Sequence, residues 1–236
     1  DDSAAIYAQS TGDQGSGNVT VRLASGGSVV GGNASGVGIQ IFGGANNLIE
    51  NHGSVSALSG SAILADIGNE RIDNYGTITG NVELGTGSNA FNNLNGSTFN
   101  PLASIALGSG QLLTNAGTLA PGGKGSVQTS TLTGNLLQTS SGVLGIDLSL
   151  AGRSSDRLNV IGNAAVGGNV LVNPVDTGRS RIGTQQTVIL NASGGATANS
   201  LTLNAPRSPV VSYALSYPSA REIAVTTEVN FRPAGL

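Results

Sequence analysis

The densest group of side chains that could do acid–base chemistry is Asp66, Glu70, Arg71 and Asp73. Paired carboxyl groups with a neighbouring arginine are what a polysaccharide lyase or hydrolase needs to cleave a glycosidic bond. Asp73, however, falls in a sequence slot that holds Glu50 in an earlier repeat. We therefore expect a solvated face or an ion pair at this position. A glycan-cleaving enzyme that uses Asp66, Glu70 and Asp73 is kept as the alternative.

The chain has one histidine, His52, and no cysteine. A Ser-His-Asp triad would need that histidine, and the chain has no Gly-x-Ser-x-Gly nucleophile turn. One histidine without cysteine is also a poor basis for a zinc site. We therefore expect His52 to be an exposed turn residue, and we predict no catalytic residues, no metal and no cofactor.

Residues 122–126, Gly-Gly-Lys-Gly-Ser, have the composition of a phosphate-binding loop. That motif requires a glycine where this chain has Thr118, and a Ser or Thr after the lysine, where it has Gly125. A calcium-binding Gly-Gly-x-Gly-x-Asp repeat would need an aspartate at Val127. The segment is therefore predicted to be a turn.

The elements that position these residues follow from a repeated motif, apolar-x-Asn-x-Gly-x-apolar. It occurs at residues 49–55, 72–78 and 113–119, and in a longer form at 91–99. Its corner residues are Asn51 and Gly53, Asn74 and Gly76, Asn93 and Gly96, and Asn115 and Gly117. The glycines are 23, 20 and 21 residues apart, a step that is typical of a solenoid with stacked coils.

This repeat predicts three features of the coils. The asparagines should align as a ladder of hydrogen bonds between neighbouring coils. Both Asn and Gly should take the left-handed backbone that a sharp corner requires. The flanking apolar residues, such as Ile49, Ile72 and Leu113, should point inward in one column. Residues 60–65 also echo residues 36–41, so a second strand position repeats in step with the corner.

The composition supports an elongated β-structure and excludes several classes of protein. Glycine accounts for 37 of 236 residues without a Gly-X-Y period, which excludes collagen. Charged residues make up 10% and hydrophobic residues 38%, which disfavours disorder. The net charge is −3 without a Lys/Arg cluster, so we expect no nucleic-acid partner. No apolar run is long enough for a transmembrane helix. Residues 1–3 do not begin an export signal, so for an exported protein we expect the signal outside this chain.

From about residue 136 the repeat gives way to longer alternating segments. Leu144–Leu150, Tyr213–Tyr217 and residues 223–231 alternate apolar with polar or small residues over longer stretches than the earlier strands. We interpret them as hairpin-type strands that cap the solenoid and protect its last edge. The predicted division is parallel β-helix coils at 1–135 and a C-terminal β-cap at 136–231.

Several C-terminal segments occur in a recognisable order. They are Gly-Thr-Leu-Ala-Pro-Gly at 117–122, Leu-Thr-Gly-Asn at 132–135, a block at 155–168, Tyr-Ala-Leu-Ser-Tyr at 213–217 and Phe-Arg-Pro-Ala-Gly-Leu at 231–236. The block contains Asp156, Leu158, Val160, Gly162, Gly167 and Gly168. Together these segments resemble the end of a bacterial autotransporter (type V secretion) passenger domain.

The resemblance implies a right-handed, single-stranded parallel β-helix with a C-terminal β-hairpin capping module. It further implies that the block at 155–168 is an autochaperone or junction region, and that residues 232–236 begin a linker to a membrane β-barrel. The expected protein is a structural stem or adhesin, on the outer membrane or released from it, with a role in virulence. Its expected partners are host surface or matrix molecules, neighbouring bacterial cells and its own translocator barrel. A spacer for an upstream effector domain is a further alternative.

Overall fold

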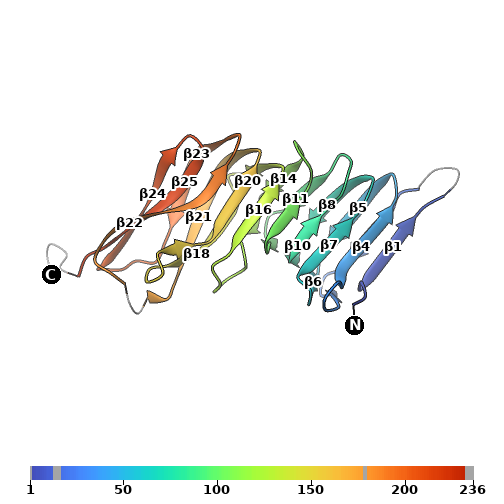
Figure 1. Cartoon of the computed structure of the whole chain (residues 1–236), viewed down its shortest axis with the longest axis horizontal. Coiled ribbons are helices and arrows are strands. Elements are labelled where there is room, and N and C mark those ends of the chain that lie inside the picture. Colours follow the sequence, from blue (N-terminus) through green and yellow to red (C-terminus); the bar gives the residue numbers. More distant parts are fainter. Residues whose placement is uncertain (1, 13–16, 178–179, 232–236) are drawn as a thin grey trace.

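The computed structural model describes residues 2–12, 17–177 and 180–231, which form an all-β structure. The strands belong to one 10-stranded and one 15-stranded sheet. Figure 1 shows them stacked as rungs along the long axis of the molecule, with the N-terminus at one end and the C-terminal strands at the other. This arrangement is solenoid-like and consistent with a parallel β-helix.

The first six coils each contribute one strand to each of three columns, and the first column continues for two more strands. The first column is β1 (Ile6–Ser10), β4 (Val37–Gly43), β7 (Ser61–Ala65), β10 (Asn81–Glu83), β13 (Ser104–Ala106), β16 (Thr129–Thr133), β20 (Arg157–Ile161) and β22 (Gly183–Ala192). The second is β2 (Thr20–Leu23), β5 (Asn46–Asn51), β8 (Asn69–Asn74), β11 (Ala90–Asn93), β14 (Leu112–Asn115) and β17 (Asn135–Gln138). The third is β3 (Ser28–Gly31), β6 (Ser54–Ala57), β9 (Thr77–Thr79), β12 (Thr98–Asn100), β15 (Thr118–Leu119) and β18 (Val143–Ser149).

The strands within a column pair in parallel and keep equivalent residues in register. Ile49 pairs with Ile72, Ile72 with Phe91, and Phe91 with Leu113. The predicted column of inward apolar residues is therefore confirmed. The second predicted repeat is also confirmed, because Ile39 pairs with Ile63.

The core consists of three such apolar columns, one from each strand column. Their members are Ile39, Ile63, Val82, Ile105, Leu132 and Val160; Ile49, Ile72, Phe91, Leu113, Leu136 and Ala164; and Val55, Ile78, Phe99, Leu119, Leu144 and Val170. All of them are buried, because alternate side chains of each short strand point into the coil. Phe91 and Phe99 meet across the interior with their ring centroids 4.6 Å apart.

Parallel stacking continues through the boundary predicted at residues 135 and 136. β21 (Asn163–Val175) is long enough to pair in parallel with both β17 and β18, and β23 (Gly195–Asn204) pairs in parallel with β21. The prediction of hairpin-type strands is therefore wrong for β20 and β21, and for β18 it holds only at Leu148 and Ser149, which pair antiparallel with a short following strand. Alternation of apolar residues reports which side chains are buried, and it does not report the direction of the neighbouring strand.

Antiparallel pairing begins late in the chain. β24 (Val211–Ser219) pairs antiparallel with β25 (Glu222–Val229), and β25 pairs antiparallel with β22. The short β19 (Ser154–Ser155) also pairs antiparallel with β18. The linker predicted at 232–236 lies outside the described residues. Within the described residues, no helix has the length and apolar character needed to cross a membrane.

Candidate functional site

A continuous row of buried carboxamides, here called the amide ladder, runs along the corner between the second and third strand columns. Its members are Asn51, Asn74, Asn93, Asn115 and Gln138. Each asparagine Nδ2 donates to the side-chain oxygen of the next member, at 2.8 Å for the first three bonds and 3.0 Å for the bond to Gln138. Each also donates to a backbone carbonyl of the next coil, such as Asn51 to Thr77.

The ladder also forms the corner itself. Asn51 Oδ1 accepts the N–H of Gly53, and Asn74 Oδ1 accepts the N–H of Gly76. Gln138, which the sequence analysis did not identify, ends the row by donating to the carbonyl of Gly167 at 2.7 Å. The ladder therefore supplies partners for amides that would otherwise be orphaned inside the coil.

The reason for glycine at these corners differs from the one predicted. Gly53, Gly76 and Gly117 do not have a left-handed backbone, and neither do the ladder asparagines. A Cβ at Gly76 would instead lie 2.1 Å from the carbonyl oxygen of Gly53 in the coil below. Glycine is required here because successive backbones approach too closely to admit a side chain.

The fourth corner, at Asn93, has a different layout from the other three. Gly96 has a φ of 82° and nothing near its Cβ position, so it serves the left-handed turn that was predicted for all four corners. Because Thr98 pairs with Thr77, Ser97 and not Gly96 lies beside Gly76. The Ser97 hydroxyl donates to Asn93 Oδ1 at 2.8 Å. The two extra residues of this repeat are accommodated in a turn at the corner.

A second row of polar residues lies at the opposite ends of the same strands and was not predicted. Its members, Asn47, Glu70, Asn89 and Gln111, each precede a ladder asparagine by four residues. Asn47 Nδ2 donates to Glu70 Oε1 at 2.7 Å, and Asn89 Oδ1 accepts the backbone N–H of Glu70 at 3.0 Å. The constant separation of four residues between the two rows is the sequence signal that could have identified the second row.

Glu70 is the one carboxyl group in that row. It is 2% exposed, and its Oε2 has no hydrogen-bond partner. Burial raises the pKa of Glu70, the hydrogen bond from Asn47 lowers it, and the nearby Asp66 raises it. A carboxyl group therefore occupies a position that suits a neutral amide.

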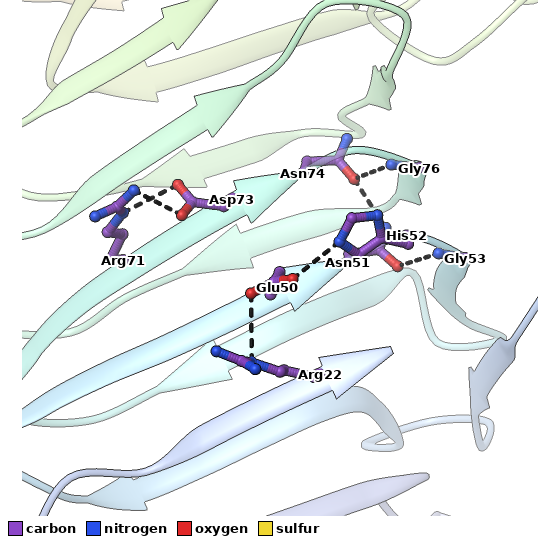
Figure 2. A network of polar contacts seen from close by, with 9 residues as sticks. All are labelled: Arg22, Glu50, Asn51, His52, Gly53, Arg71, Asp73, Asn74 and Gly76. Carbon is purple, nitrogen blue, oxygen red and sulfur yellow. Dashed lines mark hydrogen bonds and ion pairs between the residues drawn. The ribbon is translucent and has the colours of Figure 1, made fainter. Parts of the chain in front are cut away.

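The outer face of β2, β5 and β8 carries a network of charged and aromatic side chains, drawn in Figure 2 except for Tyr75. Glu50 forms an ion pair with Arg22 at 3.3 Å and a hydrogen bond with His52 at 2.9 Å. The ring of His52 stacks on Tyr75, with centroids 4.4 Å apart. His52 is thus an exposed corner residue, as predicted, and it also takes part in a hydrogen bond and a ring stack.

The carboxyl groups considered for acid–base chemistry do not form one site. Asp73 faces outward and pairs with Arg71 at 2.8 Å (Figure 2), whereas Glu70 points to the interior from the same strand. Asp66 accepts the backbone N–H of Gly43 at 2.8 Å and of Ile67 at 2.7 Å in a turn. Because the sheet lies between Glu70 and Asp73, the three groups cannot act on one glycosidic bond.

The block at 155–168 contributes to both core and corners. Leu158 and Val160 are buried in the first column. Gly162 and Gly168 have positive φ values, and a Cβ on either would lie 2.3 Å from a carbonyl oxygen of the preceding coil. Gly167 provides the carbonyl that ends the amide ladder.

Asp156 is buried and lies beside a second buried carboxyl group, Asp147, which the sequence analysis missed. Asp156 accepts the backbone N–H of Asp147 at 2.8 Å and of Gln128 at 2.7 Å. Burial raises the pKa of Asp156 to about 7, with a further contribution from Asp147 and opposition from the two N–H donors. Asp156 therefore links β18 to the end of the turn at Gln128.

The segment 122–126 is a turn, as predicted, and it holds an anion of the protein itself. The backbone N–H groups of Gly125 and Ser126 donate to Asp147 Oδ2, the latter at 2.7 Å. Asn173 Nδ2 donates to the other oxygen of Asp147. Successive N–H groups of a glycine-rich turn form a favourable cradle for negative charge, here a carboxylate.

Across residues 2–12, 17–177 and 180–231, no three His, Asp or Glu side chains converge as a metal-binding group would. The buried polar residues instead bond to backbone and to one another, so the arrangement is suited to holding coils together. No protein-family model matches this chain, and a search of curated proteins also finds no match.

Proposed function

We propose that this chain is part of the passenger domain of a bacterial autotransporter and serves as a surface stem and adhesin. In this proposal the solenoid is right-handed, and the C-terminal β24–β25 hairpin caps it and promotes folding during secretion. The protein would act at the cell surface or after release, and would attach to host surface or matrix molecules or to neighbouring cells.

The observation that carries the proposal is the continuous parallel stacking of coils from β2 to β23, which the amide ladder fastens between Asn51 and Gln138. Stacked coils form a rod whose length grows with each repeat, which suits a stem that projects from a surface. A right-handed winding is supported by the strong preference for right-handed crossovers between parallel strands.

The C-terminal part supports a capping role. β25 buries Ile223 and Val225 in the core, and its antiparallel pairing covers the edge of β22. Uncovered edges invite pairing with other chains, so a hairpin at this end would protect the solenoid while it folds.

The test is to delete residues 211–229 or, separately, residues 136–231 from the complete encoded protein and to follow export in a bacterial host. We expect surface exposure to fall and protease sensitivity of the remaining coils to rise in both variants. Normal export of folded coils in both variants would contradict the capping role.

Attachment is tested separately. Cells that display the intact protein should bind host cells or matrix, or each other, more than cells that display the same protein with residues 17–135 removed. Equal attachment by the two strains would leave a spacer for another domain as the better description.

A further inference from the structure

A hollow of about 400 Å³ lies on the outer face of the third strand column, beside the turn at 122–126. Its volume lies within the roughly 300–1,000 Å³ range of small-molecule sites. The polar residues around it are Thr98, Asn100, Thr118, Lys124, Asp147 and Asn173. None of these residues belongs to the amide ladder.

The hollow exists because small residues align in neighbouring coils. Gly145 pairs with Leu171, and a Cβ on Gly145 would lie 3.1 Å from the Cβ of Ala120. Ala120 and Gly145 thus form a low floor between Asn100 and the partly exposed Leu171. The floor is apolar, and its rim is polar.

Several polar groups on the rim have no partner in the described part of the chain. They are the hydroxyls of Thr98 and Thr118, the Nζ of Lys124, and the side-chain oxygens of Asn100 and Asn173. The two threonines are register partners on adjacent strands, so their hydroxyls are spaced by about 4.8 Å. Donors and acceptors therefore surround an apolar floor.

We propose that this hollow binds a neutral pyranose unit of a glycan. The C–H face of the sugar packs on Ala120 and Leu171, and its hydroxyls bond to the threonines and carboxamides. An acidic sugar is disfavoured because the carboxyl group of Asp147 lines the same hollow and offsets the charge of Lys124. The proposal names the partner class of the adhesin, and in that respect it rests on the function proposed above.

Lys124 gives a direct probe of the hollow because it is the only lysine in the chain. Reductive ¹³C-methylation keeps its charge and labels only this residue and the terminal amine. The probes are neutral oligosaccharides of glucose, galactose, mannose and N-acetylglucosamine, each titrated against the labelled protein by NMR, with sialylated and sulfated oligosaccharides in parallel.

We expect at least one neutral oligosaccharide to shift the Lys124 signal and leave the terminal amine unchanged. Thr118→Val should weaken that binding roughly tenfold, since it removes one hydroxyl and keeps the shape. Ala120→Leu should abolish binding by filling the floor. The matched control is Thr114→Val, which alters an outward threonine of the same coil away from the hollow and should leave binding unchanged.

Three results would overturn the proposal: no shift with any neutral oligosaccharide, a shift only with acidic ones, or equal affinity in Thr118→Val, Ala120→Leu and the control. A parallel attachment assay separates this site from the general function. Normal attachment by cells displaying Ala120→Leu would reject the hollow as the adhesive site and leave the adhesin standing. Sugar binding without any attachment would reject the adhesin and leave the site standing.

Discussion

Two regions of the molecule fasten neighbouring coils with buried polar side chains, and they use different chemical groups. Between residues 51 and 138 the groups are neutral carboxamides, each bonded to the next. At Asp147 and Asp156 they are carboxyl groups, which bond to backbone N–H groups of a neighbouring strand and of the turn at 122–128.

The difference follows from what each group can donate. A carboxamide both donates and accepts, so identical residues can be stacked without limit. An ionised carboxyl group only accepts, so a second one above it adds repulsion and no bond. The amide ladder is therefore suited to a repeat, whereas the carboxyl pair is suited to a single junction whose stability depends on pH.

The largest expected effect comes from breaking the amide ladder at Asn93. Asn93→Ala should lower the free energy of unfolding by about 4 kcal/mol, because buried partners on both sides lose hydrogen bonds at about 1–3 kcal/mol each and a small cavity remains. Urea denaturation followed by circular dichroism measures this change. Asn92→Ala, on the outward side of the same strand, is the control and should cost less than about 1 kcal/mol. Equal costs would contradict the structural role of the ladder.

The junction is expected to respond to pH in a defined direction. The pKa of Asp156 is about 7 in the folded chain against an ordinary value of 3.8, so the native state binds more protons than the unfolded state between these values. The free energy of unfolding should therefore fall by about 4 kcal/mol from this group as pH rises from below about 4 to above about 7, and then level off. Urea denaturation at several pH values measures the fall. Asp156→Asn should flatten it, whereas Asp176→Asn, at an exposed position, should not.

The two kinds of corner glycine can be distinguished by substitution. Gly76→Ala should cost about 2 kcal/mol because its Cβ overlaps the backbone of the coil below. Gly96→Ala should cost about 1 kcal/mol. Its Cβ would contact no other atom, so the only cost is that of holding an alanine in a left-handed backbone conformation. Thermal denaturation of the two variants gives the order. The reverse order would indicate that torsion, and not close approach, selects glycine at the corners.

The smallest effect is a gain in stability. Burial raises the pKa of Glu70, so its contribution to stability is lost as pH rises. Glu70→Gln should therefore raise the free energy of unfolding at pH 8 by about 1 kcal/mol and change it little at pH 4. Glu83→Gln, at an exposed position of β10, serves as the control. A loss of stability at pH 8 would show that the Glu70 carboxylate is better accommodated than its surroundings suggest.

The sequence predicted the amide ladder and the apolar columns because their residues recur at nearly equal steps. Asn51 and Asn74 need only lie one coil apart for their amides to meet. The sequence could not show why residue 76 is a glycine. A glycine is found both where the backbone is left-handed and where there is no room for a Cβ. Only the separation between successive backbones decides between the two reasons.

The junction was harder to predict because it has no repeated copy. Asp147 and Asp156 are nine residues apart, and both bond to a turn some twenty to thirty residues earlier. Their contact depends on how residues 121–128 fold back over the sheet, which no periodic pattern encodes. The direction of the strands after residue 136 was missed for a related reason. Buried and exposed side chains alternate around Ile146 in the same way whether its strand pairs in parallel or antiparallel.

The amide ladder has a direction, and this bears on the order in which coils assemble. Every asparagine amide donates toward the C-terminal neighbour, while the oxygens of Asn51 and Asn74 receive the corner N–H. The asparagine of a coil added at the N-terminal end therefore donates at once to the side-chain oxygen of the coil already in place. A coil added at the C-terminal end instead presents an amide donor that bonds only to water until the next coil arrives. If the stack grows from its C-terminal end toward its N-terminal end, the ladder amide of each new coil finds its acceptor as soon as the coil is added.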